Sequence, residues 1–360
     1  MHPGSVLPAR PLALHPVPAH RTVTPTYPGI RASDRYLWDN WAAHHNGELF
    51  RFALQAPRFG PGGELLDPES RHLAASIAGW RFTGHGYEEY GTLLAPRSGD
   101  PEAFDHTAVW SGSALSYRGR FLLAYTGVRL VGDEPLQTIG LAEFDPATGR
   151  YRRPARPLLA PDPAAHELGY FTGASPHGIM AWRDPFLWHD DEAGELPVFF
   201  AAHFSPERAA EAGLGGDPGA LSTIGHAILD PDDPFGPVHL QPWLNLPGSW
   251  HQMELPVMER GPDGLRLHAN TVTFDDQGRR HQALRSWRAM SPGESWQNGS
   301  AEGDLCGTLT GIYGQNFVRD PGTGRMLTMH FSEDDFSLSP LVPRETTNRA
   351  PPQGGRPVRV

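Results

Sequence analysis

The sequence predicts an all-β fold, a five-bladed β-propeller with a funnel at its centre. Strand-sized apolar segments separated by turns run along the chain, which contains 41 glycines and 37 prolines. Short polar motifs also recur evenly: 71 residues separate Asp39 from Trp110, 74 separate Trp110 from Asp184, and 70 separate Asp184 from Glu254. A long, even period with about four strands per unit is typical of propellers. A two-sheet sandwich would explain the strand density but not the even placement of the motifs.

Each unit pairs its polar motif with a hairpin. In the first unit, apolar and polar side chains alternate over residues 48–55, directly after the turn dipeptide Asn46-Gly47. The strand-sized segments of the next four units are 107–115 with 121–126, 182–188 with 197–204, 252–258 with 265–274, and 311–318 with 326–331. Five such units fill the body of the chain.

The division of the chain follows from composition. Residues 1–30, rich in Pro and His, are expected to form an extended leader, residues 31–336 the propeller, and residues 337–360 a disordered tail. The leader lacks the basic and apolar regions of a secretory signal, which predicts a cytoplasmic protein or one exported by a non-classical route. No segment approaches the roughly 18 consecutive apolar residues of a membrane-spanning helix.

Charge and cysteine content argue against several classes of partner. Acidic residues outnumber basic ones by 41 to 30, giving a net charge of -11, so neither nucleic acid nor an anionic membrane is expected as a partner. Cys306 is the only cysteine, which leaves no intrachain disulfide and no Cys-based metal site. The 18 histidines are scattered without a His-x-x-x-His pair. We expect neither a metal nor a cofactor.

Three acidic residues stand near the start of their units: Asp39, Asp184 and Glu254. Because the first strand of each propeller blade lines the channel, these side chains are expected to face one another. Such a group could bind a metal or act as acid and base. Metal binding is disfavoured because hard cations usually take several oxygen ligands from one loop. Glycosidic bond cleavage fits better, since it needs one carboxylate as nucleophile and one carboxylic acid as proton donor.

Four motifs in order resemble the levansucrase/fructosyltransferase family (glycoside hydrolase family 68), in the clan (clan J) that also contains invertases. They are Trp38-Asp39-Asn40-Trp41, Trp110-Ser111-Gly112-Ser113-Ala114, Arg183-Asp184-Pro185 and Glu254-Leu255-Pro256. The resemblance covers residues 36–331 and implies a divergent member acting on sucrose or fructans. It implies a retaining enzyme in which Asp39 is the nucleophile, Glu254 the acid and base, and Asp184 the transition-state stabiliser.

The resemblance also implies which residues contact the sugar. Trp38, Trp110 and Ser111 would shape the pocket, and Arg183 would assist Asp184. Gln252 stands where the family usually has another acidic residue, and His268 is a candidate for the basic residue that contacts the second sugar. We therefore expect both near the subsites beyond the fructosyl unit.

Two alternatives remain open at this stage. One is an arabinan- or xylan-type glycosidase of the related five-bladed family, which also uses two Asp and a Glu but often inverts the anomeric configuration. The other is a non-catalytic sugar-binding propeller that has kept the pocket and lost turnover. In all three interpretations the partner is a small sugar or an oligosaccharide.

Overall fold

The structure is a computed structural model that describes residues 27–67, 70–168, 170, 181–205, 207, 210, 221–248, 250–261, 264–297, 304–308 and 312–343. These residues form mainly β-strands, with the short helix α1 (Pro163–Glu167) and a 3-10 turn at Ser70–His72. Within these ranges, no helix combines the length and the apolar character that crossing a membrane requires.

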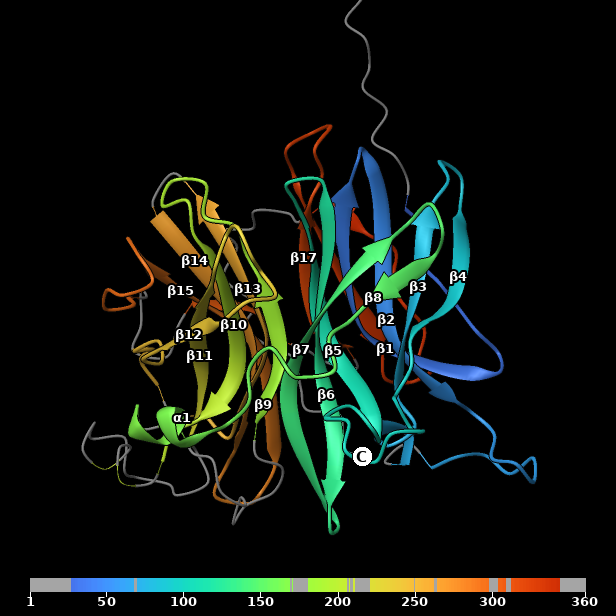
Figure 1. The fold of residues 1–360 in the computed structure, drawn as a ribbon, viewed down its shortest axis with the longest axis horizontal. Helices are drawn as coiled ribbons and strands as arrows, with labels where there is room; N and C mark the ends of the chain where they lie inside the picture. Colours follow the sequence, from blue (N-terminus) through green and yellow to red (C-terminus); the bar gives the residue numbers. More distant parts are fainter. Residues whose placement is uncertain are drawn as a thin grey trace, which may run out of the picture.

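The strands form five antiparallel sheets, which we call blades 1 to 5 (Figure 1). Blade 1 contains β1 (Arg35–His45), β2 (Glu48–Pro57), β3 (Ser76–Phe82) and β4 (Tyr87–Leu94), and blade 2 contains β5 (Ala108–Tyr117), β6 (Arg120–Val131), β7 (Glu134–Asp145) and β8 (Arg150–Arg152). Blade 3 contains β9 (Trp182–Leu187), β10 (Leu196–His203), β11 (Ser222–Leu229) and β12 (Val238–Gln241), and blade 4 contains β13 (Gln252–Gly261), β14 (Gly264–Phe274), β15 (Arg280–Ala289) and β16 (Asp304–Thr308). Blade 5 contains β17 (Ile312–Arg319), β18 (Met326–Ser332) and β19 (Val342–Pro343). Strands adjacent in sequence are adjacent in each sheet.

The first strand of each blade lies at the centre of the molecule. β1 contacts β5 and β17, β9 contacts β5 and β13, and β13 contacts β17, so the five first strands close a ring. Figure 1 shows β9, β5 and β17 near the middle and β15 and β4 at opposite sides. This arrangement confirms the predicted five-bladed propeller. The predicted turn after β1 is also present, since Asn46 and Gly47 both have the positive φ of a tight hairpin.

Each first strand carries one irregularity in its pairing with the second strand. The residues at or beside these five interruptions are, in blade order, Asp39, Ser111, Asp184, Leu255 and Gly314. All but Ser111 have a positive φ, between 34° and 63°. A β-bulge turns a side chain out of the regular alternation of a strand. The polar motifs of the sequence therefore coincide with a backbone feature that recurs once in each blade.

Aromatic and aliphatic side chains fill the spaces between blades. Between blades 1 and 2, the rings of Phe50 and Phe52 lie with centroids 5.1 and 5.9 Å from that of Phe121. Trp182 and Phe200 of blade 3 belong to a buried cluster shared with blade 2. Full burial of such a side chain contributes about 1.5–3 kcal/mol. These contacts hold the inner strands side by side and so fix the bulges relative to one another.

Segments from both ends of the described chain close the ring beside blade 5. Tyr27 forms an isolated bridge with Leu341, and Ile30 forms one with Leu338. Leu338 and Leu341 are 2% and 4% exposed. The segment 337–343, which the sequence analysis assigned to a disordered tail, instead packs against the body, because its leucines enter apolar gaps next to β18. The remaining boundaries of the three-part division stay predictions.

Candidate active site

Asp39 and Ser111 meet across the junction of blades 1 and 2. The Ser111 hydroxyl donates a 2.7 Å hydrogen bond to Oδ2 of Asp39. The other carboxylate oxygen, Oδ1, is buried and has no hydrogen-bond partner among the described residues. Gly314 of blade 5 lies close by, since a Cβ built there would come within 3.0 Å of Oδ1. One oxygen of Asp39 is therefore anchored and the other is not, which suits a carboxylate nucleophile.

The surroundings of Asp39 set its protonation. The pKa of Asp39 is raised to about 6, mainly by burial and also by the neighbouring charge of Glu254. The Ser111 hydrogen bond and the positive charges of Arg71 and Arg183 lower this pKa. At neutral pH the carboxylate is therefore mostly ionised, the form that nucleophilic attack requires.

Arg183 lies between the other two predicted catalytic carboxylates. Its Nη2 donates a 2.7 Å hydrogen bond to Oε1 of Glu254, and its Nε lies 3.8 Å from Oδ2 of Asp184. Oδ2 of Asp184 also accepts a 3.3 Å hydrogen bond from the backbone N–H of Leu255. Among the described residues, no group of three or more His, Cys, Asp or Glu side chains is arranged to hold a metal ion. Positive charge next to Asp184 and Glu254 comes from Arg183.

The pKa values of Asp184 and Arg183 are both raised, but for different reasons. Burial raises the pKa of Asp184, the charges of Glu254 and Asp39 add to the rise, and Arg183 opposes it. Burial alone would lower the pKa of Arg183, but the charges of Glu254 and Asp184 outweigh it and raise that pKa. The three carboxylates thus influence one another electrostatically, as groups do when they share one site.

Hydrogen bonds from blade 2 fix the bulge of blade 3. The Thr126 hydroxyl donates a 3.0 Å hydrogen bond to the Ser111 carbonyl and accepts a 2.9 Å bond from the Asp184 N–H. The side-chain oxygen of Gln137 accepts bonds of 3.2 Å from the Trp182 N–H and 3.4 Å from Nη1 of Arg183. These two polar residues hold the Arg183–Asp184 motif against the Ser111 bulge, and sequence spacing gave no sign of either.

Two tryptophans and a histidine form one side of the site. The His72 ring lies edge-on between Trp38 and Trp110, with centroid distances of 5.9 and 6.0 Å. Nε1 of Trp110 donates a 2.6 Å hydrogen bond to the His72 carbonyl. Burial, and then the charges of Arg71 and Arg183, lower the pKa of His72 to about 4, which keeps the ring neutral. The structure thus brings both predicted tryptophans together, around a histidine that the sequence analysis missed.

Arg71, next to His72, is a second residue that the sequence analysis missed. Its guanidinium lies 5.1 Å from the Trp38 ring centroid and 4.6 Å from that of Phe336. Its charge lowers the pKa of Asp39. Both Arg71 and His72 belong to the 3-10 turn between β2 and β3, which carries no periodic motif that a sequence pattern could have identified.

Gln252 and His268 lie in β13 and β14, respectively. Nε2 of His268 lies 2.9 Å from Oε1 of Glu259, and the His268 side chain is 1% exposed. The strand partner of Glu254 is Asn270, whereas His268 pairs with Val257. The described contacts thus direct His268 toward Glu259, and its predicted contact with a second sugar, like that of Gln252, stays a prediction.

Comparisons with known proteins identify the fold. The structure is similar to inulosucrase from Halalkalicoccus jeotgali bound to kestose, with 20% identity, a TM-score of 0.60, and coverage of 86% of this chain and 79% of that one. It is also similar to the β-fructofuranosidase catalytic domain of Microbacterium saccharophilum K-1, with 19% identity, a TM-score of 0.62, and coverage of 89% and 80%. The chain has the propeller fold of the fructosyltransferases and β-fructofuranosidases.

That fold is shared more widely. A thermostable family-43 glycoside hydrolase matches with 11% identity and a TM-score of 0.58 over 92% of this chain and 98% of that one. No protein-family model and no curated protein matches the sequence. At these identities the likeness establishes the fold, and the chemistry has to be argued from the site itself.

Proposed function

We propose that this protein is a divergent member of the fructosyltransferase group, a retaining enzyme that transfers or hydrolyses fructosyl units of sucrose or a similar β-fructoside. The observation that carries the proposal is the asymmetry of Asp39, whose Oδ2 is held by Ser111 while Oδ1 is unbonded. The Arg183 contact to Glu254, beside Asp184, supports it. No cofactor takes part in this chemistry.

In the first half-reaction, Oδ1 of Asp39 attacks the anomeric carbon of the fructosyl unit. The bond from that carbon to the glycosidic oxygen breaks, Glu254 gives its proton to the departing oxygen, and a covalent fructosyl-Asp39 ester forms. Glucose leaves when sucrose is the donor. Asp184 and Arg183 bind the fructosyl hydroxyls and stabilise the oxocarbenium-like transition state.

In the second half-reaction, Glu254 acts as a base. It removes a proton from the acceptor, whose oxygen attacks the anomeric carbon and releases Asp39. Arg183, whose Nη2 lies 2.7 Å from Oε1 of Glu254, would hold this carboxyl group in position for the step. Two inversions give retention, which requires Asp39 and Glu254 carboxyls about 5–5.5 Å apart. Water as acceptor gives hydrolysis, and a sugar hydroxyl gives transfer.

The remaining predicted residues have binding roles in this proposal. Trp38 and Trp110, which are 1% and 7% exposed, are proposed to shape the wall of the sugar pocket, since aromatic rings pack well against the C–H faces of sugar rings. Gln252 and His268 are proposed to act beyond the fructosyl unit. Residues 31–336 would form the catalytic domain, against which the segment 337–343 packs.

A glycosidase of the arabinan or xylan type is the second candidate, because a family-43 glycoside hydrolase shares the fold. The Ser111 hydroxyl on Asp39 favours the first candidate, since an anchored nucleophile suits the retaining mechanism whereas an inverting enzyme needs room for a water at its base. A non-catalytic sugar-binding propeller would not need three carboxylates and an arginine that influence one another electrostatically.

The decisive experiment follows free glucose and free fructose separately while the purified protein is incubated with sucrose. Glucose in excess of fructose indicates transfer, and equal amounts indicate hydrolysis. Asp39→Ala is the control and should release neither sugar. Parallel incubation with arabinan and xylo-oligosaccharides tests the second candidate. If the unmodified protein releases no glucose, the first candidate is wrong.

A further inference from the structure

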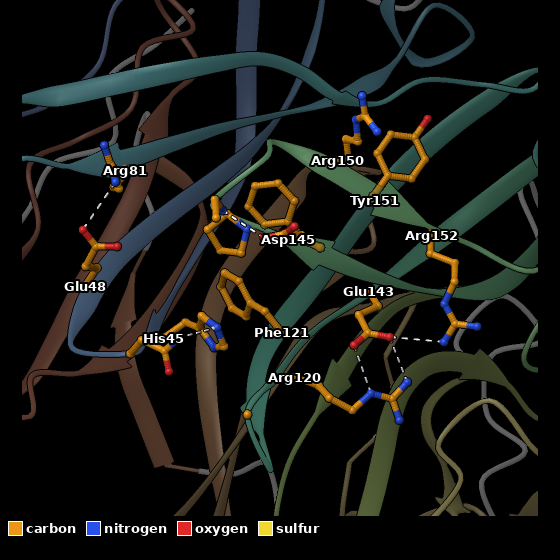
Figure 2. Close-up of a pocket in the computed structure, with 15 residues that line it drawn as sticks. His45, Glu48, Arg81, Arg120, Phe121, Glu143, Asp145, Arg150, Tyr151 and Arg152 are labelled. Atoms are coloured by element: carbon orange, nitrogen blue, oxygen red, sulfur yellow. Dashed lines mark hydrogen bonds and ion pairs between the residues drawn. The ribbon is translucent and has the colours of Figure 1, made fainter.

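A cavity of about 620 Å³ lies between blades 1 and 2, away from the acidic centre. Its walls come from the β1–β2 turn, from β3, and from the blade-2 strands β6, β7 and β8 (Figure 2). His45, which lines it, follows Asp39 by six residues in β1, a distance of roughly 20 Å at the rise of a strand. Its volume lies in the range of small-molecule sites, about 300–1,000 Å³.

The wall formed by blade 2 is an ordered ion-pair cluster. Arg120 donates two hydrogen bonds of 3.2 and 3.0 Å to the two carboxylate oxygens of Glu143, and Arg152 donates one of 3.2 Å to Oε2. Both guanidiniums also lie over the Phe235 ring, at 5.0 and 4.7 Å. Because these long side chains are already held, a ligand that binds them loses little further side-chain entropy.

The opposite wall and the floor complete the cavity. Figure 2 shows Arg81 and Glu48, 3.5 Å apart, facing the Glu143 cluster across the hollow, with His45 and Phe121 between them. The rings of His45 and Phe121 stack with a centroid distance of 4.6 Å and an interplanar angle of 6°. The cavity thus has polar walls on both sides and an aromatic floor.

The charge balance of the lining decides the class of ligand. Four arginines face three carboxylates, and Arg81, Arg120 and Arg152 all have a carboxylate partner. Only Arg150, among the arginines of this lining, makes no ion pair with a described residue. An anion would need several unpaired cations, whereas paired charges offer both donors and acceptors to a neutral molecule with many hydroxyls. Tyr151, 37% exposed at the rim, adds an aromatic face.

From these features we infer that the cavity between blades 1 and 2 is a second carbohydrate-binding site, which holds a neutral oligosaccharide distant from the funnel. This inference rests on the proposed function for the identity of the sugar, a fructose-containing oligosaccharide. It predicts that the protein binds its oligosaccharide in two places, and that loss of the second place leaves cleavage of sucrose unchanged.

Isothermal titration of Asp39→Ala protein with the trisaccharide kestose tests the inference. Tyr151→Ala or Arg152→Ala is added to the Asp39→Ala protein. Each should weaken kestose binding at one of the two expected sites by about tenfold or abolish it. Arg129→Ala is the matched control, because Arg129 is also a partly exposed blade-2 arginine paired with a glutamate, 3.3 Å from Glu102, but does not line the cavity. It should bind kestose like the background.

Two results would overturn the inference. One is kestose binding that neither cavity substitution changes, and the other is inorganic phosphate binding that both substitutions abolish, which would make the cavity an anion site. Sucrose turnover, measured with Tyr151→Ala and Arg152→Ala in the chain that keeps Asp39, tests the proposed function separately. The unmodified protein could show no sucrose turnover while Tyr151→Ala still abolishes one kestose-binding site. This pair of results would refute the fructosyl chemistry but support the second site.

Discussion

Asp39 and Asp184 occupy the same position in two blades. Both lie at a bulge of the first strand, with positive φ values of 34° and 56°. Their neighbours differ: Asp39 accepts a hydrogen bond from the neutral Ser111 hydroxyl, whereas Asp184 lies beside the Arg183 cation and accepts a backbone N–H. The repeat thus provides the same backbone bulge twice, and the adjoining side chains give the two carboxylates different surroundings, which match the separate roles proposed for them.

The largest expected effect comes from neutralising each aspartate in turn. Asp39→Asn should lower the rate of glucose release from sucrose by about 10⁴-fold or more, since removal of a nucleophile abolishes the covalent step. Asp184→Asn should cost about 10²–10³-fold, as is typical for loss of one stabilising contact. Initial rates at saturating sucrose measure both.

Chemical rescue sharpens the same comparison. A small anion such as azide can replace a missing carboxylate nucleophile, so it should restore turnover in Asp39→Ala. It should not restore turnover in Asp184→Ala. Equal losses and equal rescue in the two variants would show that the two carboxylates do not have separate roles.

The next largest effect is expected at the bulge of blade 5, where Gly314 has no side chain. In Gly314→Ala the new Cβ would lie 3.0 Å from Oδ1 of Asp39, and kcat should fall by about 10- to 100-fold. Gly47→Ala is the matched control, because Gly47 also has positive φ but a Cβ there meets no atom within 4 Å. Thermal unfolding should show a loss of about 1–2 kcal/mol in both from the positive φ, and a larger loss in Gly314→Ala, whose Cβ would also lie 3.1 Å from the Phe331 ring. A kcat unchanged in Gly314→Ala would contradict the open position of Oδ1.

A smaller effect is expected on the pH dependence. With the pKa of Asp39 at about 6, kcat/KM should fall as the pH drops below this value, because Asp39 becomes protonated. Ser111→Ala removes a hydrogen bond to the ionised form, so the acid limb should move to higher pH by about one unit. Ser113→Ala should leave the limb in place, since the Ser113 hydroxyl accepts from Leu187 instead. An identical shift in both variants would exclude a specific role for Ser111.

The smallest expected effect is on stability, and its sign is the informative part. The folded-state pKa of Asp39, about 6, lies above its ordinary value of 3.8. Between these two pH values the folded protein therefore binds more protons than the unfolded chain. As a result, the ionised Asp39 carboxylate destabilises the fold above pH 6. Asp39→Asn should therefore raise the free energy of unfolding at pH 7 by about 1 kcal/mol or more, since one pKa unit corresponds to about 1.4 kcal/mol. Urea unfolding at pH 7 and pH 4 measures it, and the gain should vanish at pH 4.

Asp145→Asn provides the opposite case. Hydrogen bonds from Thr148 and the Ala147 N–H lower the pKa of Asp145. This carboxylate therefore stabilises the fold above its unfolded pKa, and the stabilisation is lost as the pH falls through its lowered folded pKa. Its substitution should destabilise the protein at pH 7. If Asp39→Asn also destabilises the protein at pH 7, as Asp145→Asn is expected to do, the unfavourable burial of the Asp39 carboxylate would be contradicted.

The fold was accessible from the sequence because a propeller is periodic. The even spacing of Asp39, Trp110, Asp184 and Glu254 indicates the length of a blade, and the turn dipeptide Asn46-Gly47 indicates a hairpin. Both depend on local sequence alone. The same spacing identified four of the five first strands by their polar motifs. Gly314 in the fifth has no side chain and so gave no polar signal.

The contacts that complete the site were not accessible in this way. Thr126 and Gln137 bond to residues 58 and 45 positions further along the chain, and Arg71 reaches Trp38 from a 3-10 turn. Such contacts depend on how neighbouring blades are placed, which a strand pattern does not encode. The pairing of Glu254 with Asn270, and of Val257 with His268, could not be predicted for the same reason, since it depends on a shift of ladder register between Glu254 and Val257.

The bridges that join Tyr27 to Leu341 and Ile30 to Leu338 bear on the order in which the molecule assembles. Each blade is built from strands consecutive in sequence, whereas this closure unites segments roughly 300 residues apart, the kind of contact that slows folding. Asp39 lies in β1, which contacts β17 and β18 of blade 5. Nascent chains that lack the last segments would therefore lack these contacts, and the proposed sugar pocket would be among the last features to form.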